Sequence, residues 1–169
     1  MADVQAAEPF LDPLDRRIAT ELVHEGRVSF QELGRRVHLS PNSAADRVRR
    51  LQRTGVIARY TAELDLAVLG RHLLAMSDIK LQPDVDRLEF ERRLDGVAQV
   101  LAATHTTGEY DYQVRLACTG TEDLEAVVDT LRALGVREIH SRIVLSEVLF
   151  DPARLLDDGT RARPRVPRR

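Results

Sequence analysis

Residues 39–55 hold the densest group of side chains able to recognise another molecule, in the order LSPNSAADRVRRLQRTG. Ser40 and Pro41 are typical of a helix start, and Gly55 suits the left-handed position just after a helix end. The sequence therefore predicts one helix over Ser40–Thr54 that carries its own start and stop signals.

The two sides of this predicted helix differ in chemistry. Ala44, Val48 and Leu51 recur at i, i+4 and i+7 and form one apolar stripe. The opposite side presents amide, hydroxyl and guanidinium groups, which can bind the phosphates and base edges of DNA. The residues expected to contact DNA fall into two groups: Asn42, Ser43, Asp46, Arg47 and Arg50 at base edges in the major groove, and Ser40, Arg49 and Arg53 at phosphates.

A second helix is predicted immediately before this one. Ser29 and Glu32 have the spacing of a capping box, and Phe30, Leu33 and Val37 recur at i, i+3 and i+7. A short turn then leads to the basic helix, which is the helix-turn-helix arrangement of DNA-binding domains. The alternative is a structural helix pair with a solvated charged face, and the almost purely arginine character of that face argues against it.

Charge is unevenly distributed along the 169 residues, whose formal net charge is -2. Residues 12–60 hold ten Arg against six acidic residues, a net charge of +4. Residues 61–150 hold nine basic against sixteen acidic residues, a net charge of -7, and residues 151–169 have a net charge of +3. A basic first part and an acidic middle part indicate two modules with different partners. The partner of the basic module is expected to be double-stranded DNA.

Several other classes of protein are disfavoured by the composition. Cys118 is the only cysteine and the five His residues lack metal-ligand spacing, so we expect no disulfide framework, metal site or cofactor. The acidic start of the chain does not resemble a signal peptide, and no apolar run approaches the roughly 20 residues that span a bilayer. We therefore expect a soluble, cytoplasmic protein with no membrane partner.

The whole chain predicts an α+β organisation. A first helix starts near Asp12, so that residues 12–55 form an N-terminal helix-turn-helix DNA-binding domain. Residues 56–70 are expected to be a linker and hinge, in which the β-branched segment 56–62 forms a strand that two subunits could exchange. Residues 151–169 are rich in Arg and Pro and are expected to be a flexible tail.

The segment from residue 71 to residue 150 alternates between strand and helix patterns. The strands are expected at 71–81, 100–107, 112–118 and 139–148, and the helices at 84–94 and from a cap at Thr121 to a stop at Gly135. The order β-α-β-β-α-β is that of a ferredoxin-like sandwich, in which two helices cover one face of the sheet. The other face is expected to be apolar, and a second copy of the chain is its simplest cover.

An ordered set of short motifs extends over about residues 12–150. It consists of Leu39-Ser-Pro, Arg47-Val-Arg-Arg-Leu51, Gly55-Val-Ile, Tyr60-Thr, Leu94-x-x-Val-x-x-Val100, Thr107-Gly-Glu-Tyr-Asp-Tyr112 and Ile143-Val-Leu145. This set resembles the Lrp/AsnC family, the leucine-responsive or feast/famine transcriptional regulators. The resemblance implies dimers that often assemble into octamers, and an amino-acid effector that binds between dimers and changes assembly or DNA binding.

The same resemblance implies an effector site in the C-terminal domain, formed by Thr107, Gly108, Tyr110 and Asp111 together with Ser141. The chemistry of the loop fits that use, because Gly108 lets backbone N–H groups approach a carboxylate and Asp111 could hold an ammonium group. The alternative interpretation is a hairpin turn whose tyrosines pack at an interface.

An enzyme of the same architecture is the alternative function. Sirohaem decarboxylases share this architecture and use pocket histidines, and His105 and His140 are expected on the two central strands, where they could approach each other. The basic recognition helix argues against this alternative, and also against a stand-alone ligand-sensing module. We therefore predict no catalytic residues and no enzymatic activity.

Overall fold

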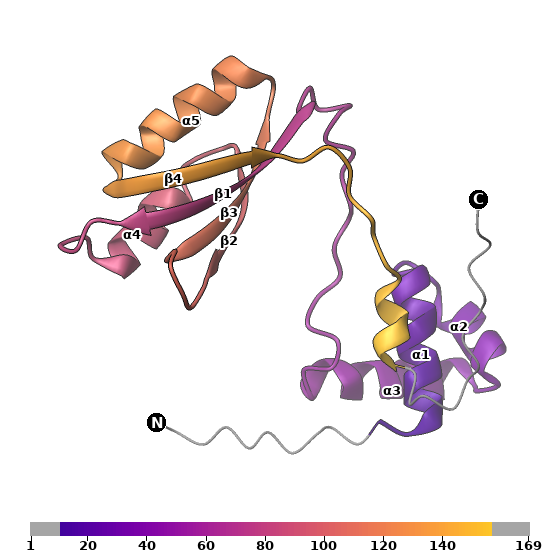
Figure 1. The fold of residues 1–169 in the computed structure, drawn as a ribbon. Helices are drawn as coiled ribbons and strands as arrows, with labels where there is room; N and C mark the ends of the chain where they lie inside the picture. Colours follow the sequence, from indigo (N-terminus) through magenta and orange to yellow (C-terminus); the bar gives the residue numbers. More distant parts are fainter. Residues whose placement is uncertain (1–10, 157–169) are drawn as a thin grey trace. The chain divides into compact units, whose positions relative to one another are not determined.

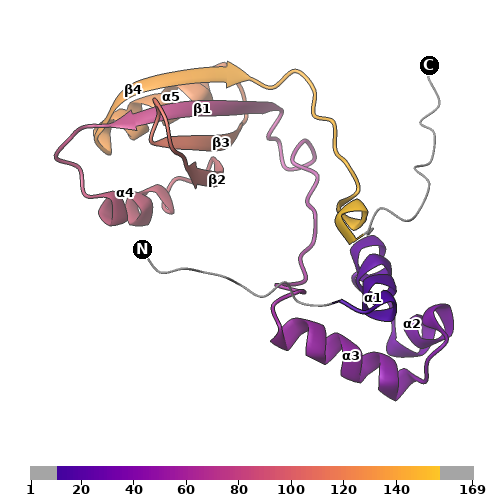
Figure 2. The same ribbon diagram turned by 60° about the horizontal axis from the view of Figure 1, so that its bottom comes forward.

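The computed structural model describes residues 11–156, which divide into two compact units. The described part of the first unit comprises residues 11–63 and 149–156, and we call it the helical unit. The second comprises Leu64–Val148, and we call it the sheet unit. Figure 1 and Figure 2 show the elements of each unit. No described helix has the length and apolar character needed to cross a membrane.

Four short helices make up the helical unit: α1 (Pro13–His24), α2 (Phe30–Val37), α3 (Pro41–Arg53) and the 3₁₀ helix η1 (Pro152–Leu156). The first three each begin after a side-chain cap, which is Asp12, Ser29 or Ser40. Each cap oxygen accepts a hydrogen bond from the backbone N–H three residues further on, which satisfies a donor that the helix itself leaves unpaired. The caps predicted at Ser29 and Ser40 are confirmed.

The core of the helical unit joins all three α-helices. Its fully buried residues are Ile18, Leu33, Val37, Ala44, Val48 and Leu51, so the apolar stripe predicted on α3 is confirmed. The turn between α2 and α3 is tight: His38 adopts a left-handed conformation with φ of 59°, and Leu39 N–H donates to the Gly34 carbonyl at 2.8 Å. Gly34 is required here, because a Cβ atom would lie 2.7 Å from the Leu39 carbonyl oxygen.

The strand predicted over residues 56–62 does not form in the described chain. Val56 and Ile57 instead pack on the core of the helical unit, and Ile57 N–H donates to the Leu51 carbonyl at 3.0 Å. A strand is defined by its ladder, and no described segment pairs with the residues that follow. Exchange of this segment between two subunits stays a prediction.

The expectation of a flexible tail after residue 150 is wrong for the first residues of that segment. The 3₁₀ helix η1 packs against α1 and buries Ala153. Arg16 Nη1 donates to the Leu156 carbonyl at 3.1 Å, and His24 Nε2 lies 2.8 Å from Asp151 Oδ2. The Arg and Pro content of residues 151–169 led to the prediction of a flexible tail. The contact of η1 with α1 depends instead on a few apolar residues and one carboxylate. The remainder of the predicted tail, residues 157–169, lies outside the described residues.

The sheet unit has the predicted order of elements: β1 (Leu73–Leu81), α4 (Arg87–Leu94), β2 (Val100–His105), β3 (Tyr112–Cys118), α5 (Thr121–Ala133) and β4 (Val136–Ile143). The strands lie in the order β2-β3-β1-β4 and all neighbours are antiparallel, which confirms the ferredoxin-like topology. Helices α4 and α5 lie on the same side of the sheet (Figure 1).

Several predicted boundaries in the sheet unit differ from the structure: β1 begins at Leu73 rather than at residue 71, β2 ends at His105 rather than at residue 107, and β4 begins at Val136 rather than at residue 139. Helix α4 begins after the Asp86 cap rather than at residue 84, and Thr121 is the first residue of α5, whose N-cap is Gly120 without a side-chain bond. Strand β4 ends at Ile143 rather than at residue 148. The reason is that β1 begins at Leu73, so that no partner remains for β4 beyond the 2.8 Å bond from Val144 N–H to the Leu74 carbonyl.

The two faces of the sheet have different compositions. The face under the helices is apolar, with a core formed by Ala75, Ile79, Phe90, Leu94, Tyr112, Val114, Leu116, Cys118, Val127, Leu131 and Val136. The opposite face carries both apolar and charged side chains, so the prediction that it is apolar is wrong in part. Asp78 there forms an ion pair with Arg142 and accepts a hydrogen bond from Gln113 at 3.1 Å. The topology alone predicted that this face is open, but it did not specify the residues.

Candidate nucleic-acid interface and effector pocket

Most of the polar side chains predicted to contact DNA lie on the exposed surface of α3. Asn42, Asp46, Arg49 and Arg53 follow at i, i+4, i+7 and i+11, so they form one row along the helix, which we call the exposed row. Ser43 is also exposed and lies beside this row. Arg49 Nη1 is 2.7 Å from Asp46 Oδ1, and both side chains remain largely open to solvent. These groups are therefore free to exchange water for phosphates and base edges.

Arg47 and Arg50 lie differently, because both guanidinium groups are paired with carboxylates of α1 and its cap. Arg47 Nη1 is 2.6 Å from Asp12 Oδ2 and 2.9 Å from Asp15 Oδ1. Arg50 pairs with Asp15 Oδ2 and lies 3.5 Å from Asp12 Oδ2. The structure thus brings two of the predicted base-contacting residues together with two acidic residues for which no role was predicted from the sequence.

Asp12 and Asp15 lie in different environments. The hydrogen bond from Arg47 holds the pKa of Asp12 below its ordinary value of 3.8, and the same contact raises the pKa of Arg47. The side chain of Asp15 is only 3% exposed, and a carboxylate is stable in such a place only when it is paired and hydrogen-bonded. The sequence contained one signal for the burial of Asp15. This residue precedes Ile18 and Ala19 by three and four positions, so it lies on the buried face of α1.

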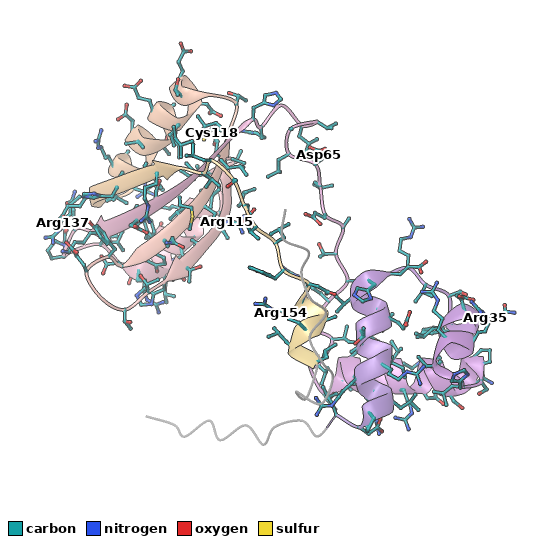
Figure 3. The ribbon with its side chains drawn as sticks, turned by 45° about the vertical axis from the view of Figure 1, so that its right-hand side comes forward. Arg35, Asp65, Arg115, Cys118, Arg137 and Arg154 are labelled. Carbon is teal, nitrogen blue, oxygen red and sulfur yellow. The ribbon has the colours of Figure 1, made fainter. Side chains whose placement is uncertain are left out.

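A second ion-pair cluster joins α2 to α1. Glu32 does not complete the predicted capping box, because its carboxylate accepts hydrogen bonds from Arg35 and Arg36 instead. These two guanidinium groups lower the pKa of Glu32 to about 2. Arg36 also contacts Glu21 and Glu25 of the first helix and its cap, whereas Arg35 lies on the outside of α2 (Figure 3). The cluster therefore links α2 to the C-terminal end of α1.

The loop predicted to bind an effector is a tight turn between β2 and β3. Gly108 adopts a φ of +115°, a value that L side chains rarely adopt, and it faces open space. Thr106 N–H donates to the Asp111 carbonyl at 2.9 Å and closes the turn, in which Thr107 is exposed. Asp111 is held from the other side, because Leu81 N–H donates to its Oδ2 at 2.7 Å.

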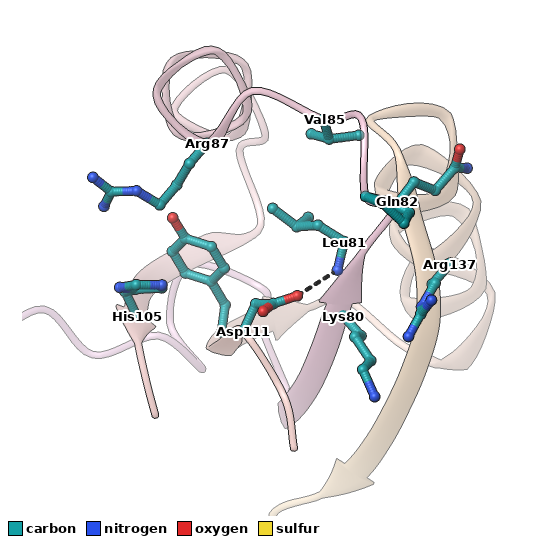
Figure 4. Close-up of a pocket in the computed structure, with 10 residues that line it drawn as sticks. Lys80, Leu81, Gln82, Val85, Arg87, His105, Asp111 and Arg137 are labelled. Carbon is teal, nitrogen blue, oxygen red and sulfur yellow. Dashed lines mark hydrogen bonds between the residues drawn. The ribbon is translucent and has the colours of Figure 1, made fainter. Parts of the chain in front are cut away.

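Asp111 lines a pocket of about 360 Å³ at the end of the sheet (Figure 4). The residues that line this pocket are Lys80, Leu81, Gln82, Pro83, Val85, Arg87, His105, Asp111, Tyr112 and Arg137. Tyr112 forms its buried floor: its hydroxyl donates to Glu91 Oε1 at 2.5 Å, and its ring centroid is 5.0 Å from that of His105. Burial and the bond to Glu91 raise the pKa of Tyr112 to about 12, so the hydroxyl is a neutral donor at physiological pH.

The other predicted effector residues do not meet in this pocket within one chain. The Tyr110 ring lies 5.4 Å from the His140 ring. Ser141 Oγ is 2.8 Å from Ser77 Oγ, in the ladder between β1 and β4. Of the five predicted residues, only Asp111 lines the pocket in Figure 4.

Comparison with known proteins assigns both units. Residues 11–52 match the AsnC-type helix-turn-helix domain, and residues 74–153 match the Lrp/AsnC ligand binding domain. The leucine-responsive regulatory proteins of Escherichia coli (strain K12) and Salmonella typhimurium are each 35% identical to this chain over 146 residues, which cover 82% of this chain and 87% of the relative. This chain belongs to the Lrp/AsnC family.

Solved structures agree with this assignment. A transcriptional regulator of Neisseria meningitidis in complex with L-methionine aligns with a TM-score of 0.78 and 29% identity, over 85% of this chain and 95% of that one. The feast or famine regulatory protein of M. tuberculosis, complexed with L-methionine, aligns with a TM-score of 0.76 and 29% identity, over 84% and 97% of the two chains. This member of the Lrp/AsnC family is thus a DNA-binding transcriptional regulator.

The alternative enzymatic function depended on two histidines that the structure separates. His105 lies on β2 and His140 on β4, which are the two edge strands of the sheet and not its central strands. The prediction that they approach each other is therefore wrong, because this topology places β1 and β3 in the centre. Within residues 11–156 no group of three or more His, Cys, Asp or Glu side chains could hold a metal ion.

Proposed function

We propose that this Lrp/AsnC regulator reads specific DNA sequences through α3, and that an amino acid bound to its sheet unit changes its DNA affinity or its assembly. The division of α3 into two sides carries the first part of the proposal. One side supplies the core of the helical unit, while the exposed row on the other side presents amide, carboxylate and guanidinium groups to solvent. The two relatives that hold L-methionine support an amino acid as the class of effector.

Assembly is part of the same proposal. We infer that two chains form a dimer through residues 71–148, and that dimers can assemble further into an octamer. The regulator is proposed to act on DNA in the cytoplasm. The mixed face of the sheet supports a second copy as its cover, because apolar Leu74 and Met76 line a depression of about 200 Å³ there. Light scattering is expected to show a dimer or larger species. A monomer at micromolar concentration would contradict this model.

DNA recognition is tested with two arginine variants of α3. Duplexes that the wild-type protein enriches from a randomised pool are compared with scrambled duplexes of the same composition. Arg53→Ala is expected to weaken the binding of enriched and scrambled duplexes alike. It should also reduce the slope of log K against log salt concentration by about one. Arg50→Ala is expected to lose preference for the enriched duplexes at a cost of about 1–3 kcal/mol.

The matched control is Arg132→Ala, which removes one guanidinium group from the exposed face of α5. It should leave both affinities unchanged. If Arg50→Ala keeps the wild-type preference, α3 does not dock on DNA as we propose.

The effector site is tested at Asp111 by calorimetry with a panel of amino acids. Asp111→Asn keeps an oxygen that can accept the Leu81 N–H bond, but it removes the charge that would hold an ammonium group. Asp111→Ala removes both. If Asp111 binds the ammonium group, both variants lose the ligand while their ligand-free DNA affinity stays near that of the parent.

Two outcomes would contradict this part of the proposal. If Asp111→Asn binds the amino acid as tightly as the parent, the carboxylate charge plays no part in recognition. If no amino acid binds the parent, the turn from Thr107 to Tyr112 is only an interface turn, and regulation must come from the amount of protein.

A further inference from the structure

The carboxylate of Asp15 is the least exposed acid in the described part of the helical unit. Each of its two oxygens takes a different guanidinium group from the recognition helix: Oδ1 faces Arg47 and Oδ2 faces Arg50. Asp15 N–H is itself bound by the Asp12 cap at 2.8 Å, which fixes the backbone at this point. One buried residue of α1 thus determines where two arginine side chains of α3 point.

The two arginines are held to different degrees. Arg47 is bound at short distance by both Asp12 and Asp15 and is 30% exposed, so it acts mainly as part of the scaffold. Arg50 is bound closely by Asp15 alone and its side chain is 47% exposed. A guanidinium group has five N–H donors in a rigid planar fork, and the single Nη2 contact with Asp15 leaves donors open to solvent.

The position of Arg50 on the helix makes these free donors relevant to DNA. Ser43, Asp46 and Arg50 follow at i, i+3 and i+7, so Arg50 lies beside the exposed row of α3. An arginine that reads guanine through two parallel hydrogen bonds must hold its plane in one orientation. A free arginine side chain loses rotamer freedom when it is fixed, and a side chain that is already held loses less of it.

We propose that Asp15 is a positioning residue for sequence recognition: it holds the guanidinium plane of Arg50 so that the outward N–H groups meet a base edge in a single orientation. Asp15 does not touch DNA itself and acts through Arg50. This inference rests on the docking of α3 proposed above. It adds a residue outside the recognition helix to the determinants of specificity.

The test measures specificity rather than affinity alone. Binding of enriched and scrambled duplexes is measured for the wild type, Asp15→Asn, Arg50→Ala and the double variant, at several salt concentrations. Asp15→Asn is expected to lower the ratio of the two affinities about tenfold, which is within the range of one bidentate base contact. The affinity for scrambled duplexes should stay the same or rise, because the variant has one negative charge fewer.

Two comparisons separate positioning from a merely structural role. In the Arg50→Ala background, Asp15→Asn should change the ratio no further, because its effect passes through Arg50. Asp129→Asn on α5 removes the same charge from an exposed ion pair and should leave the ratio unchanged. The proposal is overturned if Asp15→Asn keeps the wild-type ratio, or if it still lowers the ratio when Arg50 is absent.

A second variant applies if Asp15→Asn does not fold. Arg50→Lys keeps the charge at an exposed position but loses the planar fork, and it should lower the ratio as much as Asp15→Asn would. A wild-type ratio in Arg50→Lys shows that orientation of the guanidinium plane is not used and overturns the proposal. If Arg50→Ala itself keeps full specificity, the docking of α3 is wrong instead, so the two failures are distinguishable.

Discussion

The helical unit and the sheet unit differ in how their predicted functional residues are arranged. On α3 the predicted residues are neighbours, because the helical period brings positions three and four apart onto one surface. In the sheet unit the predicted effector residues contact different partners, with Asp111 at Leu81, Tyr110 at His140 and Ser141 at Ser77. The surface of one helix therefore follows from the helical period alone, whereas the positions of residues on several strands and a turn also depend on strand register.

The largest expected effect is on stability, and it distinguishes the paired arginine Arg47 of α3 from the exposed arginine Arg49 of the same helix. Arg47→Ala should lower the free energy of unfolding by about 3 kcal/mol, because it leaves the buried carboxylate of Asp15 with one partner fewer. Arg49→Ala should change stability little, because its ion pair with Asp46 is exposed. Urea denaturation of both variants checks this prediction. Equal losses of unfolding free energy in the two variants would mean that the ion pairs of Arg47 with Asp12 and Asp15 do not stabilise the packing of α3 on α1.

A smaller effect is expected at the turn that sets the angle between α2 and α3. Gly34→Ala should destabilise the helical unit by about 1–3 kcal/mol, because the new methyl group overlaps the Leu39 carbonyl oxygen. Gly26→Ala is the matched control, since its nearest atoms lie 3.7 Å away. Thermal melts followed by circular dichroism measure both. If the two variants melt alike, the turn can relax without cost.

The smallest effects concern pH, and they have opposite directions in the two units. The pKa of Tyr112 is raised from 10.0 to about 12, so the stability it contributes is complete below pH 10 and is lost as the pH rises through about 12. The pKa of Glu32 is lowered from 4.5 to about 2, so its contribution is complete above pH 4.5 and is lost as the pH falls towards 2.

Matched variants measure these two contributions. The stability difference between the wild type and Tyr112→Phe should shrink in strong base, and that between the wild type and Glu32→Gln should shrink in acid. Urea midpoints measured across both pH ranges provide the check. A difference that does not change with pH in either case would show that the group titrates alike in the folded and unfolded chain.

Local patterns in the sequence predicted the elements more accurately than their partners. Strand β3 has the predicted bounds, and α3 has the predicted cap and buried stripe, because alternation and capping are properties of neighbouring residues. The role of Asp15 and the partners of Asp111 follow from contacts between residues far apart in the chain. Such contacts leave only weak signals in one sequence, for example a single carboxylate on an otherwise apolar helix face.

The contact between α1 and η1 has a consequence for the order in which the chain folds during synthesis. Arg16 and the Leu156 carbonyl that it binds are separated by 140 positions, and the whole sheet unit is translated between them. Contacts between distant positions form late, and chains fold from the N-terminus as the ribosome releases them. Helices α1, α2 and α3 therefore leave the ribosome before their last neighbour exists. A nascent chain that stops before Asp151 carries its recognition helix on an unfinished domain.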